Sequence, residues 1–185
     1  MISAGDFKNG LTFEMGSGIF QVVEFQHVKP GKGSAFVRTK LKNIVTGVTL
    51  EKSFNPTEKF ESAYIEKKTM QFSYSEGDLK YFLDMDSYEM VPIEEKHLGD
   101  GFRFVKEEME VKVLSHKGTI FGVEIPNFVE LKVAEADPGI KGNTVTNATK
   151  PAKLETGAVI RVPLFINEGD TVKIDTRTGE YIERV

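Results

Sequence analysis

The sequence predicts an all-β protein built from three small β-barrels, and three observations support this fold class. Apolar and polar side chains alternate with a period of two along many short segments, which is typical of strands that bury one face. Short turns, most of them with glycine, separate these segments. Helical periodicity is scarce. The 185 residues contain no cysteine, which excludes disulfides and thiolate metal sites.

Four pairs of strands follow one another along the chain. The first pair, residues 20–25 and 35–41, is joined by a loop at residues 29–34. The other three pairs are hairpins with turns at 75–78, 115–118 and 176–179. Their strands are residues 70–74 with 80–85, 109–114 with 119–125, and 171–175 with 180–182. Strands linked by such turns are typical of small barrels and sandwiches.

The best helical segment runs from Ile93 to Lys106, and Gly99-Asp100-Gly101 breaks it into two pieces. One short helix among about five strands favours an OB-type barrel, in which a helix links the third and fourth strands.

Two boundaries divide the chain into residues 1–64, 65–128 and 129–185. The first lies near residues 63–66, after the Phe54-Asn55-Pro56-Thr57 break, and the second lies near residues 125–128. Each segment is small for an independent core. We therefore expect three barrels in contact with one another, without flexible linkers.

The net charge of −4, from 24 basic and 28 acidic residues, argues at first against a nucleic-acid partner. Its distribution changes this interpretation. Residues 1–64 hold eight basic and six acidic side chains, whereas residues 65–128 hold eight and thirteen, and residues 129–185 hold eight and nine. The stretch from His27 to Lys42 contains Lys29, Lys32, Arg38, Lys40 and Lys42 and no acid. Basic charge is therefore concentrated in one place.

The loop Lys29-Pro30-Gly31-Lys32-Gly33-Ser34 reverses the chain between two strands. Pro30 restricts φ, whereas Gly31 and Gly33 permit positive φ, so Lys32 is expected at the apex of a protruding hairpin. A lysine there is a mobile point charge suited to a phosphate and open to covalent extension. A solvated turn lysine is the alternative. A P-loop is excluded, because Gln26 stands at its first glycine position, Gly33 follows the lysine, and a strand continues the chain.

After the loop, Arg38, Lys40 and Lys42 are expected on one strand face, with Val37, Thr39 and Leu41 on the other. Alternating cations on an exposed strand can follow a phosphate backbone. The alternative, an ordinary solvated strand face, remains open.

No catalytic or metal site is recognisable. His27, His97 and His116 are scattered singly without metal-ligand spacing, and Asp84 and Asp86 lack the rest of an EF-hand loop. No Gly-x-Ser-x-Gly motif occurs. We expect no cofactor, no metal and no enzymatic activity. No signal sequence and no membrane-length apolar run is apparent, so we expect a cytoplasmic protein without a membrane partner.

At the Lys-Pro-Gly-Lys-Gly loop the sequence resembles bacterial elongation factor P, and the likeness extends from Met1 to Val185. The last segment carries the spacing Lys150-x-Ala152-x4-Gly157-x2-Ile160-x-Val162-Pro163-x2-Ile166-x2-Gly169. Residues 138–144 are also typical of this family.

The resemblance implies an SH3-like (KOW-type) barrel followed by two OB barrels, in an L-shaped, tRNA-like arrangement. It implies a monomeric elongation factor that binds the ribosome beside peptidyl-tRNA and relieves stalling at consecutive prolines. Lys32 would be the lysine that a modifying enzyme extends, with the chemistry of the extension left open. It would contact the tRNA CCA end, while Lys29, Arg38, Lys40 and Lys42 would contact tRNA phosphates. The elongation factor P-like paralogue and a generic OB-type RNA-binding protein are the alternatives.

Overall fold

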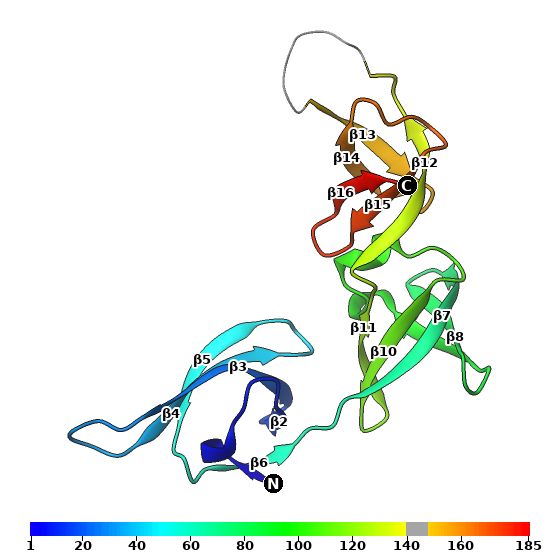
Figure 1. The fold of residues 1–185 in the computed structure, drawn as a ribbon. Helices are drawn as coiled ribbons and strands as arrows, with labels where there is room; N and C mark the ends of the chain where they lie inside the picture. The colour runs from blue at the N-terminus through cyan, green and yellow to red at the C-terminus, as the bar shows by residue number, and fades with distance from the viewer. Residues whose placement is uncertain (140–147) are drawn as a thin grey trace. The chain divides into compact units, whose positions relative to one another are not determined.

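The computed structural model describes residues 1–139 and 148–185, in which the chain forms β-strands and three short 3-10 helices (Figure 1). The strands belong to three antiparallel sheets that follow one another in the sequence. The predicted all-β class is confirmed.

The first sheet has six strands in the order β1-β6-β2-β3-β4-β5. Its longest strands, β3 and β4, follow each other in the chain, and β6 returns to pair with both β1 and β2. The elements are β1 (Ile2–Ser3), η1 (Ala4–Asp6), β2 (Thr12–Met15), β3 (Gly18–Val28), β4 (Phe36–Asn43), β5 (Thr49–Phe54) and β6 (Lys59–Ser62).

The second sheet has five strands in the order β11-β10-β7-β8-β9. Two 3-10 helices follow its third strand in the chain and precede its fourth. The elements are β7 (Glu66–Glu76), β8 (Leu79–Asp84), β9 (Met90–Glu94), η2 (Glu95–His97), η3 (Asp100–Phe104), β10 (Glu110–His116) and β11 (Thr119–Glu124).

The third sheet has five strands in the order β14-β13-β12-β15-β16. Its strands are β12 (Phe128–Ala136), β13 (Thr149–Leu154), β14 (Val159–Pro163), β15 (Thr171–Asp175) and β16 (Glu180–Arg184). The predicted hairpin at 171–182 is confirmed, since β15 has the expected bounds and Asp175 pairs with Glu180 across the turn.

The predicted helix from Ile93 to Lys106 is wrong in type and in extent, although its place between the third and fourth strands is right. Ile93 is buried in strand β9, and only Glu95–His97 and Asp100–Phe104 are helical, as 3-10 turns. Gly99 separates them with a φ of 73°, a left-handed conformation that ends a right-handed helix. Single turns cannot continue past this point.

Contacts gather the chain into two compact units. Unit 1 consists of Met1–Glu66 together with Ser115–Phe121, and unit 2 consists of Lys67–Leu114 together with Gly122–Val185. Unit 1 contains the first sheet. Its core is rich in phenylalanine: the rings of Phe7 and Phe13 stack at 4.8 Å, and Phe54 meets both of them edge-on. Stacked and edge-on pairs of this kind add to the stabilisation from burial.

Within unit 2, a residue from η3 completes the core of the third sheet. Phe104 is fully buried in one cluster with Leu131, Leu154, Ile166 and other side chains of the third sheet. The guanidinium of Arg103 lies 4.7 Å from the Phe104 ring centroid. The last two sheets are therefore bound into one unit by a side chain that neither sheet itself supplies.

Candidate functional site

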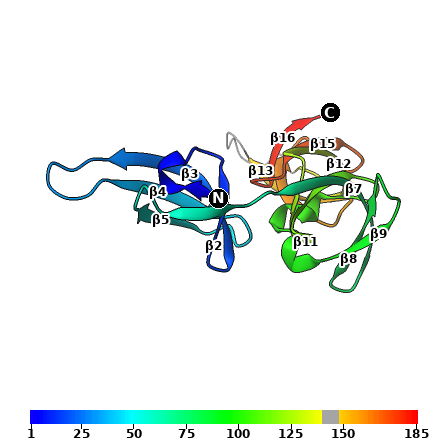
Figure 2. The ribbon, with the colours of Figure 1, turned by 90° about the horizontal axis from the view of Figure 1, so that it is seen from below.

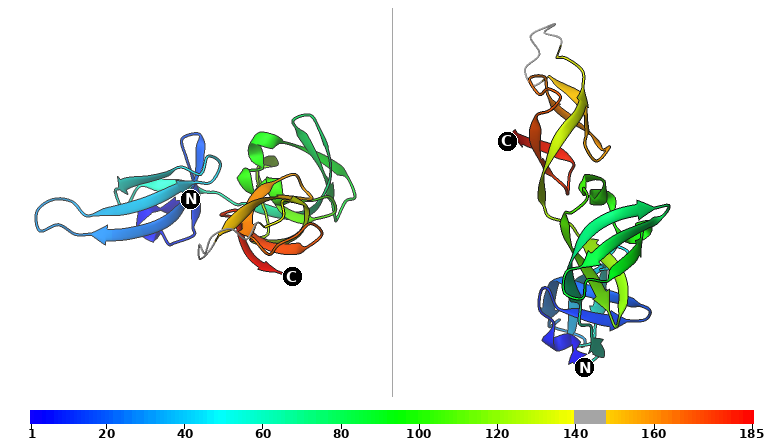
Figure 3. Two further views of the ribbon diagram at one scale, coloured as in Figure 1. Left: turned by 90° about the horizontal axis from the view of Figure 1, so that it is seen from above. Right: turned by 90° about the vertical axis from the view of Figure 1, so that its right-hand side faces the viewer.

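Strands β3 and β4 form a long hairpin in unit 1, which we call the arm (residues 23–40), and β5 pairs with β4 from Val37 to Lys42. The strands pair from Phe20 with Asn43 to Val28 with Phe36. Strand β2 pairs with β3 only from Gly18 to Gln21, so the neighbouring strand ends where the arm begins. Figures 2 and 3 show the arm projecting from the rest of the first sheet, with the loop between its strands at the far end.

The loop at the end of the arm is solvent-exposed from Lys29 to Ala35, as the sequence predicts for an apex. Gly33 adopts a φ of +110°, which side-chain-bearing residues rarely adopt. Gly31 has no positive φ, and a Cβ placed there would meet no atom within 4 Å. The positive φ that the sequence allows at both glycines is therefore adopted by Gly33 and not by Gly31, while the loop-shaping role of Gly31 stays a prediction. Lys32 stands between them, exposed to solvent.

Strand β4 has the alternation that the sequence predicts. Val37, Thr39 and Leu41 are buried, whereas Arg38 and Lys42 are exposed and Lys40 is partly exposed. The Thr39 hydroxyl donates a 2.6 Å hydrogen bond to the main-chain carbonyl of Lys52 on β5. Because the buried face is anchored in this way, the three cations are held on the opposite face.

The neighbouring strands place acidic residues on this face, which counting the charged residues along β4 alone could not show. Lys40 lies opposite Glu24 on β3 and opposite Glu51 on β5. Arg38 lies opposite Gln26 and Ser53, and Lys42 lies opposite Gln21 and Thr49, all uncharged. Lys40 therefore has carboxylates on both sides, while Arg38 and Lys42 have polar, uncharged neighbours.

Sequence reasoning also missed a hollow of about 390 Å³ at the base of the arm. It is lined by Asn9, Glu24, Phe25, Gln26, Arg38, Thr39, Lys40 and Glu51. Phe25 is 37% exposed, and its ring lies edge-on to that of His27 at 5.7 Å. A bulge between Val22 and Glu24 shifts the register of β3, so Phe25 pairs with Thr39 and lies on the face of the sheet opposite to that of Arg38 and Lys40.

The carboxyl groups whose pKa values are lowered lie outside the arm. Arg177 binds the Asp175 carboxylate through two nitrogens, at 3.0 and 2.8 Å, and this hydrogen bonding lowers the pKa of Asp175. Main-chain amides of Asp86 and Ser87 donate to Asp84 and lower its pKa. The Asp84 carboxylate thus closes a turn, which is a structural role for this Asp-x-Asp pair.

The histidines have separate surroundings. His27 contacts Phe25, whereas His116, in unit 1, contacts the carbonyl oxygen of Tyr64 at 2.8 Å and a carboxylate oxygen of Glu14 at 3.0 Å. Hydrogen bonds from Lys117 and His116 lower the pKa of Glu14. Within residues 1–139 and 148–185, no three His, Asp or Glu side chains are grouped so as to hold a metal ion.

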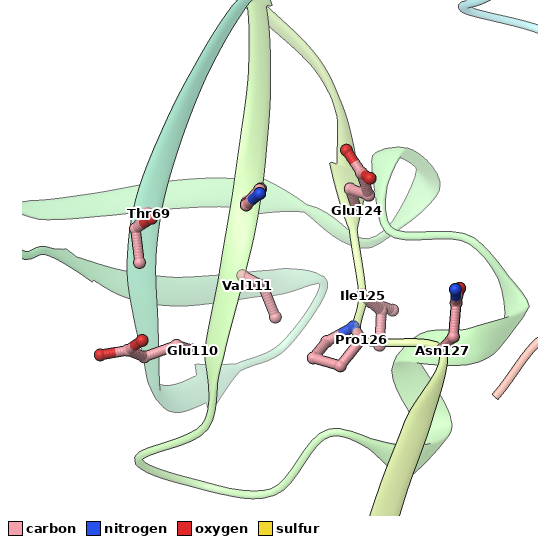
Figure 4. Close-up of a pocket in the computed structure, with 8 residues that line it drawn as sticks. Thr69, Glu110, Val111, Glu124, Ile125, Pro126 and Asn127 are labelled. Atoms are coloured by element: carbon pink, nitrogen blue, oxygen red, sulfur yellow. The ribbon is translucent and has the colours of Figure 1, made fainter. Parts of the chain in front are cut away.

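A second hollow, of about 370 Å³, lies in unit 2 (Figure 4). Val111, Ile125 and Pro126 give it an apolar wall, and Glu110, Lys112 and Glu124 are its charged residues. Glu124 pairs with Lys67 at 2.9 Å. This lining contains no serine, cysteine or histidine that could act as a nucleophile or an imidazole base. The arm, not this hollow, is therefore the candidate functional site.

Three family models match consecutive parts of the chain. They are the elongation factor P KOW-like domain at residues 3–60, the elongation factor P OB domain at 65–123, and the C-terminal domain of elongation factor P at 129–184. The chain is also 65% identical to elongation factor P of Acetivibrio thermocellus and 64% identical to that of Ruminiclostridium cellulolyticum, each over 100% of both chains. The chain belongs to the elongation factor P family.

Solved structures support the fold assignment. A eukaryotic translation initiation factor 5A from Methanococcus jannaschii aligns with a TM-score of 0.53 at 24% identity, covering 66% of this chain and 92% of that one. An eif-5a family protein from Naegleria fowleri aligns with a TM-score of 0.55 at 16% identity, covering 67% and 96%. Identities this low support the fold alone.

Membership of the elongation factor P family makes the chain a translation elongation factor that acts on the ribosome. The predicted KOW-type and OB barrels are confirmed as family domains. The boundaries at 64 and 128 stay predictions. Of the stretch 138–144 that is typical of the family, residues 140–144 lie outside the described residues.

Among the described residues, none of the helices is long and apolar enough to cross a membrane.

Proposed function

We propose that this elongation factor promotes peptide bond formation at consecutive prolines by placing Lys32 against the CCA end of peptidyl-tRNA. The observation that carries the proposal is the arm: a hairpin whose exposed end presents Lys32 beside Gly33, a glycine in a conformation that other residues rarely adopt. A lysine on such a support reaches into a narrow space that a barrel cannot enter.

The chemistry of proline explains why such a contact accelerates the reaction. Proline is a secondary amine whose ring fixes φ, so peptidyl-prolyl-tRNA is difficult to align for attack. Holding the reacting groups in a productive geometry lowers a barrier by several kcal/mol, up to about 7 kcal/mol. The ribosome performs the chemistry, and the protein acts as an orienting factor without enzymatic activity of its own.

Cations along the arm supply the affinity for tRNA in this proposal. Lys29, Arg38, Lys40 and Lys42 contact phosphates, and such contacts make binding weaker as salt rises. Arg38 and Lys42 face uncharged cross-strand neighbours and carry the larger share, because the carboxylates opposite Lys40 compete for its charge. The protein acts as a monomer in the cytoplasm, and a dedicated enzyme extends Lys32 covalently.

The test is a reconstituted translation assay on messages with and without a run of prolines. Lys32→Ala is expected to abolish the acceleration on the proline message and to leave the other message unchanged. Lys59→Ala, which removes an exposed lysine of β6, is the matched control and is expected to behave as wild type. Full acceleration by Lys32→Ala would disprove the proposal. Intact mass spectrometry of the native protein is expected to show added mass on the Lys32 peptide.

A further inference from the structure

The outer face of the second sheet carries a continuous patch of aromatic and apolar side chains. Strands β7, β8 and β9 pair in this order (Figure 2), and their register places Tyr74 opposite Tyr81 and Tyr81 opposite Pro92. Phe82, the neighbour of Tyr81, is fully buried, so these three side chains lie on the outer face. The same pairing gives this face, which we call the outer patch, nine members: Gln71, Tyr74, Glu76, Leu79, Tyr81, Leu83, Met90, Pro92 and Glu94.

A bulge brings Tyr74 to the outer patch. Simple alternation along residues 70–74 would put Phe72 and Tyr74 on the same face, but the register of β7 shifts between them. Phe72 is 7% exposed, whereas Tyr74 is 44% exposed. The Tyr74 ring stacks on that of Tyr81, with the centroids 4.6 Å apart and the planes at 11°. Tyr81 therefore fixes the orientation of a ring that remains accessible to a partner.

The charged members of the outer patch are both acids, Glu76 and Glu94, which lie on either side of Leu79. Glu94 pairs with Lys96 at 2.7 Å. Burial, and next the carboxylate of Glu76, raise the pKa of Tyr81, so Glu76 lies beside the stacked pair. The face of the second and third strands binds oligonucleotides in many OB barrels, but a patch whose own charges are negative repels phosphates. A protein partner therefore fits this face better than RNA does.

The side chains of the outer patch specify the chemistry of that partner. A guanidinium can lie over the accessible Tyr74 ring and pair with the Glu76 carboxylate, which combines a cation–π contact with an ion pair. Leu83 and Met90, which lie opposite each other, add an apolar surface, and Met90 is 42% exposed. Strand β9 is at the edge of the sheet, but Pro92 lacks an amide donor, which hinders the addition of another strand. Side chains, not main-chain pairing, therefore hold the partner.

We propose that the outer patch docks a basic segment of a ribosomal protein, with an arginine on the Tyr74 ring and an apolar side chain against Met90. Charge complementarity supports this partner, since residues 65–128 hold thirteen acidic and eight basic side chains. The family acts on the ribosome, so proteins of the ribosome are within reach of this face. The inference goes beyond the proposed function and does not depend on the contact proposed for Lys32.

Photo-cross-linking on ribosomes tests the identity of the partner. The photoreactive residue p-benzoylphenylalanine replaces Met90 in the full chain, the complex with 70S ribosomes is irradiated, and mass spectrometry identifies the cross-linked partner. A cross-link to a segment of a ribosomal protein rich in lysine or arginine is expected. A cross-link mainly to RNA or to a second copy of the chain, or no cross-link at all, would overturn the inference.

Affinity for 70S ribosomes tests the contribution of the Tyr74 ring. Tyr74→Ala is expected to weaken binding at least about threefold, whereas Tyr74→Phe keeps the ring and is expected to retain it. Glu76→Gln is expected to weaken binding about twofold. Tyr64→Ala is the matched control, because Tyr64 is 80% exposed but belongs to unit 1. Unchanged binding of Tyr74→Ala, or an equal loss for Tyr64→Ala, would contradict the inference.

The Lys32→Ala variant separates this inference from the proposed function. It is expected to form the same cross-link from position 90 as the parent chain and to fail in the proline assay. Failure in the proline assay without a cross-link in either chain would remove the outer patch as a docking site and leave the role of Lys32 standing.

Discussion

Replacing Gly33 by alanine perturbs the end of the arm without removing any charge, and Gly31→Ala is its matched control. At Gly33 the backbone has a φ of +110°. A Cβ there would meet its nearest neighbour, Cγ of Pro30, at an ordinary contact distance of 3.7 Å. The cost of the substitution therefore comes from the backbone conformation and amounts to about 1–3 kcal/mol. At Gly31 neither a positive φ nor a close neighbour opposes the Cβ.

A cost of about 1–3 kcal/mol lowers the population of the native loop conformation relative to others by a factor of about 5 to 160. The loop is exposed and lies outside the core, so it relaxes locally and the melting temperature is expected to change little. Acceleration on the proline message is expected to fall for Gly33→Ala, by at most this factor. Gly31→Ala is expected to retain most of the wild-type acceleration.

The assay combines reconstituted translation with thermal unfolding of both variants. NMR shifts of the loop amides report whether the loop conformation has changed. The reasoning would be refuted if Gly33→Ala accelerated the reaction as the wild type does, or if Gly31→Ala lost as much activity as Gly33→Ala. Either result would mean that the conformation of Gly33 does not position Lys32.

Two further predictions concern unit 2. Phe104→Ala is expected to lower the free energy of unfolding by about 3–5 kcal/mol in urea titrations, because it opens a cavity in the core of the third sheet; a loss below about 1 kcal/mol would contradict this. Arg177 lowers the pKa of Asp175 below its ordinary value of 3.8, so the ionised carboxylate stabilises the fold above that pH, and its contribution is lost as the pH falls through the folded-state pKa. The stability difference between wild type and Asp175→Asn is therefore expected to shrink with acidification, and a constant difference would argue against this pair.

Much of the fold could be predicted because strand alternation is a local property. Each of Val37, Thr39 and Leu41 is buried and is followed by a more exposed neighbour, so the face of β4 follows from its own residues. The turn at residues 176–179 could be predicted as well, because the residues that form it are neighbours in the sequence. The segment from Ile93 to Lys106 was not, because its helical spacing competes with the pairing of Ile93 with Lys80 on β8.

The candidate site, too, has features that could be predicted from the sequence and features that could not. The exposure of Lys32 and its place at the end of the arm follow from Pro30, the glycines and the flanking strands. The carboxylates beside Lys40 and the hollow at the base of the arm do not, since Asn9, Glu24 and Glu51 come from three separate places in the sequence. A bulge of one residue between Val22 and Glu24 decides which side chains of β3 meet those of β4.

The sequence by itself determined the all-β class, the order of the strands along the chain, the family and the lysine at the end of the arm. These features depend on neighbours within a few residues or on a long pattern of residue types. Only the tertiary structure decided which charges face each other across the sheet, which glycine carries the strained turn, and which core receives Phe104. The register of long-range strand pairs sets these contacts, and a shift of one residue would turn every side chain to the opposite face.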